Sequence, residues 1–153
     1  MSTFTLNISR FVETTKGDLN KAVRTTVFFL YGELSEGSPV GDPLLWENPS
    51  AAPPGYTGGR FKGNWQLGVG VVTTGTLNAI DKDGSLSKER ILSGIPEQAY
   101  GKIYYITNNL PYAQRLEDGH SKQAPFGMVA KAGMRFNRIV DAAVYSVRKG
   151  ESV

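Results

Sequence analysis

Between residues 19 and 34 the chain repeats apolar side chains at spacings of three and four, and this pattern constrains the fold more than any other feature. Such spacing places the apolar residues along one stripe of an α-helix. Asp18 can cap the helix N-terminus, and the Gly-Ser-Pro sequence at 37–39 ends the helix, because proline disfavours helical geometry in the preceding residue. A shorter helical segment is expected at about residues 9–15. The long stripe consists of Leu19, Ala22, Val23, Thr26, Val27, Leu30 and Leu34, and Ile8, Phe11 and Val12 turn inward in the shorter segment.

Two segments have the pattern of β-strands. From residue 61 to 71 the odd positions 61, 65, 67, 69 and 71 are apolar, whereas positions 62, 64 and 66 are polar, which predicts a strand with one face on the core. Gly63, Gly68 and Gly70 mark bulges or close backbone approaches in it. Residues 102–107, rich in Ile and Tyr, predict a second strand, and residues 69–80 are expected to supply a third or fourth.

The remaining elements follow from local signals. Residues 81–85 form a polar, solvated turn before a helix at about 87–99. Pro111 suits the first position of a short helix over 112–118, and Gly119 can close that helix in a left-handed conformation. A last helix is expected from about residue 126 to 148. Its buried stripe consists of Val129, Ala132, Phe136, Ile139, Val140, Ala143 and Val147, and Trp65 and Tyr105 are assigned to the core.

Together these elements predict one α+β domain over residues 1–153, with two principal helices packed on a small antiparallel sheet. A chain of 153 residues fits a single domain and buries roughly 68–70% of its unfolded surface, so its core needs no disulfide or metal. Residues 37–60 form a long Pro/Gly-rich loop. This loop also carries large apolar groups, Leu44, Leu45, Trp46 and Tyr56, which indicate an anchor that docks on this subunit or on a neighbour.

The composition excludes several chemistries. The chain has no cysteine and a single histidine, His120, so it cannot form disulfides, thiolate nucleophiles, iron–sulfur clusters or multi-histidine metal sites. We expect no cofactor. No signal peptide is visible, and the longest apolar run, at 27–31, is far shorter than the ~20 residues that span a bilayer. These features fit a cytoplasmic life history with no membrane contact.

The charge balance permits contact with nucleic acid but does not require it. The net charge is +3, and many of the cations have acidic neighbours, as in the Lys-Glu-Arg sequence at 88–90. Dedicated nucleic-acid binders cluster their cations on one face. A mixed solvated surface is therefore the preferred interpretation, and a small basic DNA-binding protein is the alternative.

Enzyme signatures are mostly missing from the sequence. Phosphate-binding, dinucleotide-binding and nucleophile-elbow motifs do not occur. Glu117, Asp118 and His120 stand close together and leave open a hydrolase, with or without a metal. Adjacent residues seldom point at one another, however, so the preferred interpretation is a helix C-terminus at which His120 lies near the last carbonyls. We expect no enzymatic activity.

Five segments in order resemble one family, the small tail-completion or head–tail joining proteins of tailed bacteriophages. Residues 38–40 read Ser-Pro-Val, and residues 58–65 read Gly-Gly-Arg-Phe-Lys-Gly-Asn-Trp. Residues 106–113 read Ile-Thr-Asn-Asn-Leu-Pro-Tyr-Ala, residues 116–121 read Leu-Glu-Asp-Gly-His-Ser, and residues 123–129 read Gln-Ala-Pro-Phe-Gly-Met-Val. The resemblance covers residues 10–148. It departs from the family where residues 41–57 are inserted.

The resemblance implies a non-enzymatic virion component of the phage neck, assembled in the host cytoplasm. It implies a closed homo-oligomeric ring of six or twelve copies that contacts connector and tail proteins. DNA would pass through the lumen without sequence recognition. Head-to-tail contacts that close by rotation form such rings.

On this hypothesis the interface residues divide into three groups. The first anchors the loop on an adjacent subunit or neck protein, the second contacts the neighbouring ring, and the third supports and forms the contact loop at 119–123. The groups are Leu44, Trp46 and Tyr56, then Arg60, Lys62 and Asn64, and finally Tyr112, Leu116, Glu117, His120 and Gln123.

Overall fold

The first element is one continuous helix, α1, from Thr3 to Gly37. The computed structural model describes residues 3–153, with side chains from residue 13 onward. The expectation of two helical segments with Asp18 as a cap is wrong, since Asp18 lies inside α1. No proline interrupts residues 3–37, and the two glycines inside the helix, Gly17 and Gly32, cost only about 1 kcal/mol each. The helix ends at Gly37 as predicted, whereas the side chains of Ile8, Phe11 and Val12 lie outside the described residues.

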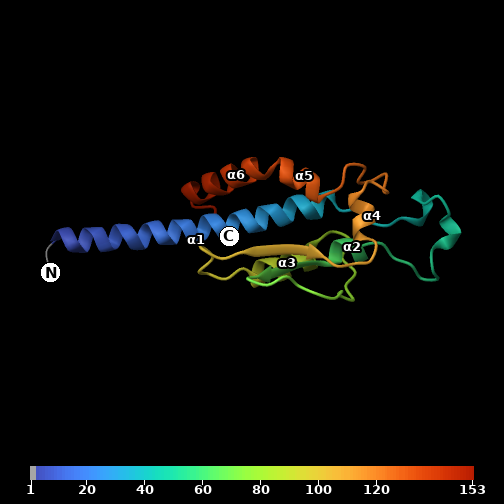
Figure 1. Cartoon of the computed structure of the whole chain (residues 1–153), viewed down its shortest axis with the longest axis horizontal. Coiled ribbons are helices and arrows are strands. Elements are labelled where there is room, and N and C mark those ends of the chain that lie inside the picture. Colours follow the sequence, from blue (N-terminus) through green and yellow to red (C-terminus); the bar gives the residue numbers. More distant parts are fainter. Residues whose placement is uncertain (1–2) are drawn as a thin grey trace.

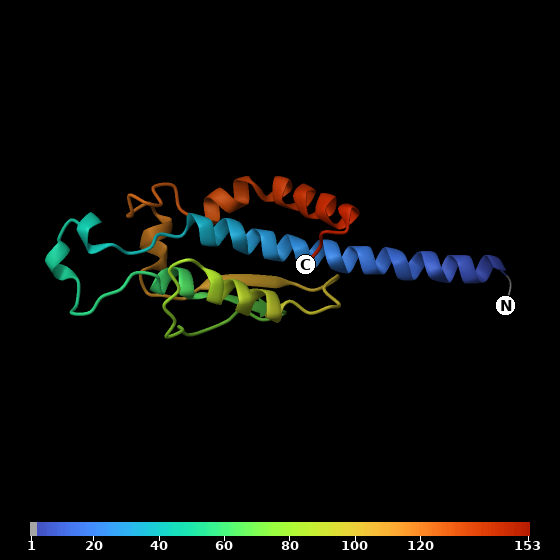
Figure 2. The same cartoon turned by 180° about the vertical axis from the view of Figure 1, so that it is seen from behind.

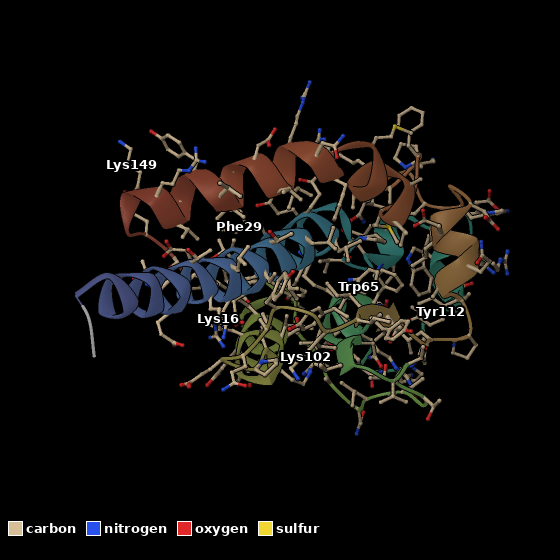
Figure 3. The ribbon with its side chains drawn as sticks, turned by 60° about the vertical axis from the view of Figure 1, so that its left-hand side comes forward. Lys16, Phe29, Trp65, Lys102, Tyr112 and Lys149 are labelled. Carbon is tan, nitrogen blue, oxygen red and sulfur yellow. The ribbon has the colours of Figure 1, made fainter. Side chains whose placement is uncertain are left out.

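Helix α1 runs through the middle of an elongated molecule (Figure 1). On one side it packs against α6 (Phe136–Lys149), and Phe29 lies between these two helices (Figure 3). The strands and α3 (Ser85–Gly94) lie on its other side, with α3 in front of the sheet in the reverse view (Figure 2). The mixed α+β class is confirmed. The expectation that the last helix packs on the sheet is wrong, because α6 packs on α1.

The sheet has two antiparallel strands, β1 (Trp65–Val69) and β2 (Tyr104–Asn108), with Trp65 opposite Asn108 and Val69 opposite Tyr104. The predicted first strand is wrong at its start, where Arg60–Gly63 form the helical turn α2 after Gly59 at φ +104°. Residues 69–80 add no further strand within the described chain. They cross close to β1 instead, since a Cβ on Gly68 would collide with the carbonyl of Val71, the kind of close approach expected at this glycine.

The short helices follow their local signals. Helix α3 ends at Gly94 rather than at residue 99, because Pro96 requires an extended Ile95. Helix α4 (Ala113–Glu117) is confirmed, and Gly119 follows it in the left-handed region at φ +84°.

The predicted terminal helix divides at Arg135 into α5 (Val129–Met134) and α6. Ala132, Ile139 and Ala143 are buried as expected. Val129 and Phe136 are not, since 54% and 44% of their surfaces are exposed.

The core lies between α1, α3 and the sheet. Val27, Leu34 and Ile91 are buried there together with Trp65, whose assignment to the core is confirmed. Tyr105 is only half-buried. Among residues 3–153, no helix combines the length and apolar character needed to cross a bilayer.

Candidate interaction surface

The Ser-Pro-Val and Arg-Phe-Lys-Gly-Asn-Trp segments meet inside the molecule. The Trp65 indole N–H donates to the Ser38 hydroxyl at 2.8 Å, and that hydroxyl donates to the carbonyl of Leu34 at 2.6 Å. Both Ser38 and Trp65 are buried. Two sequence segments that carry the resemblance are therefore joined by a buried hydrogen bond at the end of α1.

Asn64 is a structural residue and not a surface contact. None of its surface is exposed, and its amide group donates to the carbonyls of Arg60 and Leu77 at 2.8 and 3.1 Å. Its oxygen accepts from the Leu77 N–H at 2.7 Å. The prediction that Asn64 contacts a neighbouring ring is wrong, because its side chain is buried and both of its side-chain polar atoms bond within the molecule.

The two cations of this segment lie nearer the surface. Arg60 is exposed and Lys62 is half-buried. The charged groups of both side chains remain available for the predicted contact with a neighbour. The backbone carbonyl of Lys62 is used inside the molecule, where it accepts from the Ser87 hydroxyl at 3.2 Å. Burial raises the pKa of Tyr112, and the positive charge of Arg60 offsets part of that rise.

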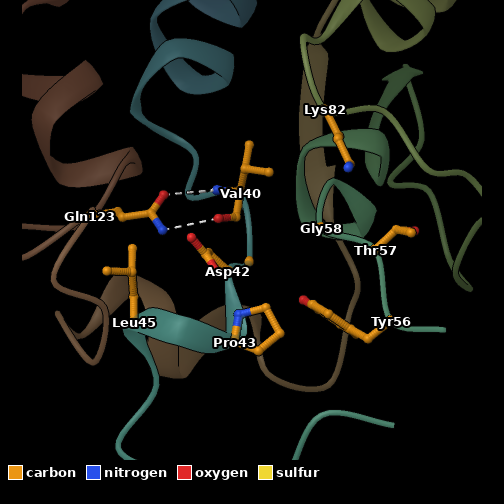
Figure 4. A pocket seen from close by; sticks show the side chains of 10 residues that line it. Val40, Asp42, Pro43, Leu45, Tyr56, Thr57, Gly58, Lys82 and Gln123 are labelled. Atoms are coloured by element: carbon orange, nitrogen blue, oxygen red, sulfur yellow. Dashed lines mark hydrogen bonds between the residues drawn. The ribbon is translucent and has the colours of Figure 1, made fainter. Parts of the chain in front are cut away.

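Residues 38–59, here called the arm, leave the body between α1 and α2 and project from one end of the molecule (Figure 1). The arm contains two short 3₁₀ turns, Pro43–Leu45 and Pro49–Ala51. At its base, the Gln123 side chain accepts from the Val40 N–H at 3.1 Å and donates to the Val40 carbonyl at 3.0 Å (Figure 4). These bonds tie the arm to the loop before α5, around an open pocket of about 540 Å³.

The far part of the arm has its own aromatic contact. The rings of Trp46 and Tyr56 pack edge to face with centroids 5.0 Å apart, and burial raises the pKa of Tyr56. These two residues were expected to dock on another surface, but in the isolated chain they hold the arm together. Leu44 and Leu45 instead face solvent, with 84% and 53% of their surfaces exposed.

Glu117 caps the helix that follows it. The backbone N–H groups of Met128, Val129 and Ala130 donate to its carboxylate at 2.8, 2.9 and 2.8 Å. Burial raises the pKa of Glu117, but the three amide hydrogen bonds outweigh this effect and hold its pKa below the ordinary value. Glu117 thus supports the loop at 119–123 from within, as a positioning group.

His120 lies where the preferred interpretation placed it. Its Nδ1 atom and its backbone N–H are 3.0 and 3.1 Å from the carbonyl of Arg115, in the last turn of α4. Leu116 is half-buried against the core, and Tyr112 is partly exposed beside the Phe61 ring. Within the described part of the chain, no group of three acidic or histidine side chains is arranged to hold a metal ion.

One buried polar cluster was missed by sequence reasoning. Asp81, with 2% of its surface exposed, accepts from the N–H groups of Gly84 and Ser87 and from the Ser87 hydroxyl. Tyr31 of α1 donates to the same hydroxyl at 2.7 Å. The solvated turn expected at 81–85 is therefore wrong at Asp81. The available signal was the Asp-x-x-Gly spacing before a helix, typical of a turn closed by the aspartate side chain.

Comparison with known proteins gives no family assignment: no family model, no curated protein and no solved structure matches the chain.

Proposed function

We propose that the chain is a structural protein of the neck of a tailed bacteriophage, where copies form a ring that joins the head or portal side to the tail. DNA passes through this ring. The proposal rests first on the resemblance of residues 38–40, 58–65 and 106–129 to head–tail joining proteins. We also propose that the fold is organised around two principal helices and that the long Pro/Gly-rich loop, which forms the arm, docks on a partner.

The arm is the observation that carries the proposal. It is an ordered projection, closed at its base by Gln123 and internally by the Trp46–Tyr56 contact, that holds Leu44 away from the body. Holding a large apolar side chain in water costs free energy, about 1.5–3 kcal/mol for a leucine that could be buried. An exposed leucine on a braced arm supports a role in docking on a partner.

Mass measurement tests the assembly directly. Native mass spectrometry of the chain alone and with connector and tail proteins should give a discrete ring of six or twelve copies in one of these mixtures. A monomer in every mixture would contradict the proposal. If that monomer also bound duplex DNA at physiological salt, the DNA-binding alternative would replace it.

Variants of the arm test the docking step. Leu44→Ser should leave the fold unchanged and reduce the joining of heads to tails, as should Arg60→Glu at the base of the arm. Ser50→Ala is the matched control, because Ser50 is exposed on the same arm and bonds only within it. If both Leu44→Ser and Arg60→Glu joined heads to tails normally, the arm would not be part of the interface.

A further inference from the structure

The two-stranded sheet has unpaired backbone groups on its outer edges. The N–H of Gly70 donates to the carbonyl of Ile103 at 2.8 Å, in the same register that sets Gly68 opposite Tyr105. Opposed residues in an antiparallel pair alternate between exchanging and not exchanging hydrogen bonds. Tyr105 and Thr107 therefore bond to β1, whereas the backbone N–H and C=O groups of Tyr104 and Ile106 point away from it.

These outward groups form the free edge of β2. Across residues 3–153, neither the N–H nor the C=O of Tyr104 or Ile106 has a hydrogen-bond partner. Both residues are only half-buried. On the outer edge of β1 the Arg90 guanidinium donates to the Trp65 carbonyl at 2.9 Å and α3 contacts this strand, but the outward groups of Leu67 and Val69 have no partner among the described residues either. An unpaired strand edge is a template for another extended backbone.

A second segment of the chain has the complementary property. Residues 71–76 read Val-Val-Thr-Thr-Gly-Thr, a β-prone composition, yet they form neither helix nor strand. Thr73 is held against its own sheet, because its hydroxyl bonds to that of Thr107 and its carbonyl accepts at 3.1 Å from the side chain of Asn109, the residue after β2. The segment bends at Gly75, whose φ is +79°, and Val72 and Thr74 lie on either side of Thr73. Neither residue has a backbone hydrogen bond among the described residues, and Val72 is 48% exposed.

We infer that residues 71–76 of one copy add as a strand to the free edge of β2 in the next copy. The inference rests on the proposed ring and names the contact that closes it. Donor segment and acceptor edge are different surfaces of the same chain, so each copy can give a strand to one neighbour and take one from the other. A head-to-tail contact of this kind is heterologous and produces a closed ring when the rotation fits.

Proline variants at the two ends provide the test. Val72→Pro removes an unbonded N–H of the donor in a segment that has no secondary structure to lose. Ile106→Pro removes an outward N–H of the acceptor and keeps the bonds of Tyr105 and Thr107 to β1. Each variant alone should fail to form rings, and an equimolar mixture should give dimers and no rings, since each partner retains one intact surface. Val72→Thr keeps the amide and should assemble normally.

Amide hydrogen exchange rates measure the same contact in the parent chain, without a substitution. In the unassembled chain, the Tyr104 and Ile106 amides should exchange much faster than those of Tyr105 and Thr107. In the assembled ring, all four should exchange slowly. If Ile106→Pro fails to fold, these exchange rates still test whether a strand adds to the edge of β2.

The outcomes separate the two proposals. A ring in which the Ile106 amide still exchanges rapidly, or which Val72→Pro forms as well as the parent chain, overturns strand addition and leaves the neck proposal standing. If the parent chain never assembles, alone or with neck proteins, both proposals fail.

Discussion

The segment from Arg60 to Trp65 and the arm before it are neighbours in sequence, but they use their side chains in opposite ways. In the segment, Asn64 and Trp65 direct their polar atoms to partners inside the molecule. In the arm, Leu44 directs an apolar group into solvent. The polar residues of the segment therefore stabilise the fold, whereas the exposed leucine of the arm is available to bind a partner.

This contrast predicts that the body is sensitive to small changes and the arm is tolerant. The largest effect is expected for Asn64→Ala, because the variant leaves the N–H and C=O of Leu77 and the carbonyl of Arg60 without their partner. A buried polar group left unpaired costs about 1–3 kcal/mol, so the free energy of unfolding should fall by about 3 kcal/mol. Urea denaturation measures this loss. Arg60→Ala, which keeps the carbonyl, should stay within about 0.5 kcal/mol of the parent chain, and equal stability of all three chains would contradict the structural role of Asn64.

Two glycines allow the same comparison at matched backbone angles. Gly127 of the body has φ +73°, and a Cβ there would lie 2.5 Å from the Glu117 carbonyl and from its carboxylate. Gly55 of the arm has φ +74° with no atom within 4 Å of such a Cβ. Left-handed geometry alone costs about 1–2 kcal/mol for other residues. We expect Gly55→Ala to lose about 1–2 kcal/mol in thermal or urea unfolding, and Gly127→Ala to lose about 3 kcal/mol, because its Cβ also collides with Glu117. Equal losses would show that the contact with Glu117 does not matter.

Because Glu117 caps α5, the stability of the body depends on pH. Because the pKa of Glu117 is lowered in the folded chain, the folded state favours the charged carboxylate. Its stabilisation is complete above the unfolded-state pKa and is lost as the pH falls through the folded-state pKa. Glu117→Gln should cost about 1 kcal/mol at neutral pH, as for the loss of a helix cap.

Urea midpoints measured at a series of pH values test this sign. The parent chain and Glu117→Gln should converge in acid as the parent carboxylate becomes protonated. Glu47→Gln, on the exposed arm, should follow the parent throughout. A gap that widens in acid would refute the assigned role of Glu117.

The smallest effect belongs to the arm itself. Trp46→Ala removes the edge-to-face contact with Tyr56, a contact worth about 0.5–1.5 kcal/mol. Limited proteolysis should cut the arm of this variant faster, while the unfolding of the body stays unchanged. Leu44→Ala is the control and should change neither quantity, because Leu44 is exposed. A fall in the stability of the whole chain on Trp46→Ala would mean that arm and body unfold together.

Much of the local structure could be predicted from the sequence. The end of α1 at Gly37, the helix before Gly119 and the two strands all follow from breakers and periodicity. Predictions failed at a left-handed backbone turn and where a side chain bonds to a distant segment. Apolar alternation from Phe61 predicted a strand, but the left-handed Gly59 starts a helical turn there. The composition of the 81–85 turn likewise could not reveal the burial of Asp81, because its partner Ser87 meets α1 only in the folded chain.

The candidate surface divides in the same way. The resemblance directed attention to Asn64 and Glu117, and the fold uses both internally, while it leaves Arg60 exposed. Leu44 was identified because a large apolar residue is unusual in a loop rich in proline and glycine. The free edge of β2 carried no sequence signal, since an open and a paired strand have the same alternation.

The sequence by itself determined where helices stop, which segments are apolar enough to be buried and which chemistries are excluded, because these depend on short-range sterics and composition. Only the tertiary structure decided which polar residues are satisfied internally, that α6 packs on α1, and which backbone groups of the strands stay unpaired. Hydrogen bonds between distant segments, such as those of Asn64 with Leu77 and of Gln123 with Val40, form only once the chain is folded. Which groups remain for a partner is therefore known only after these internal bonds have been assigned.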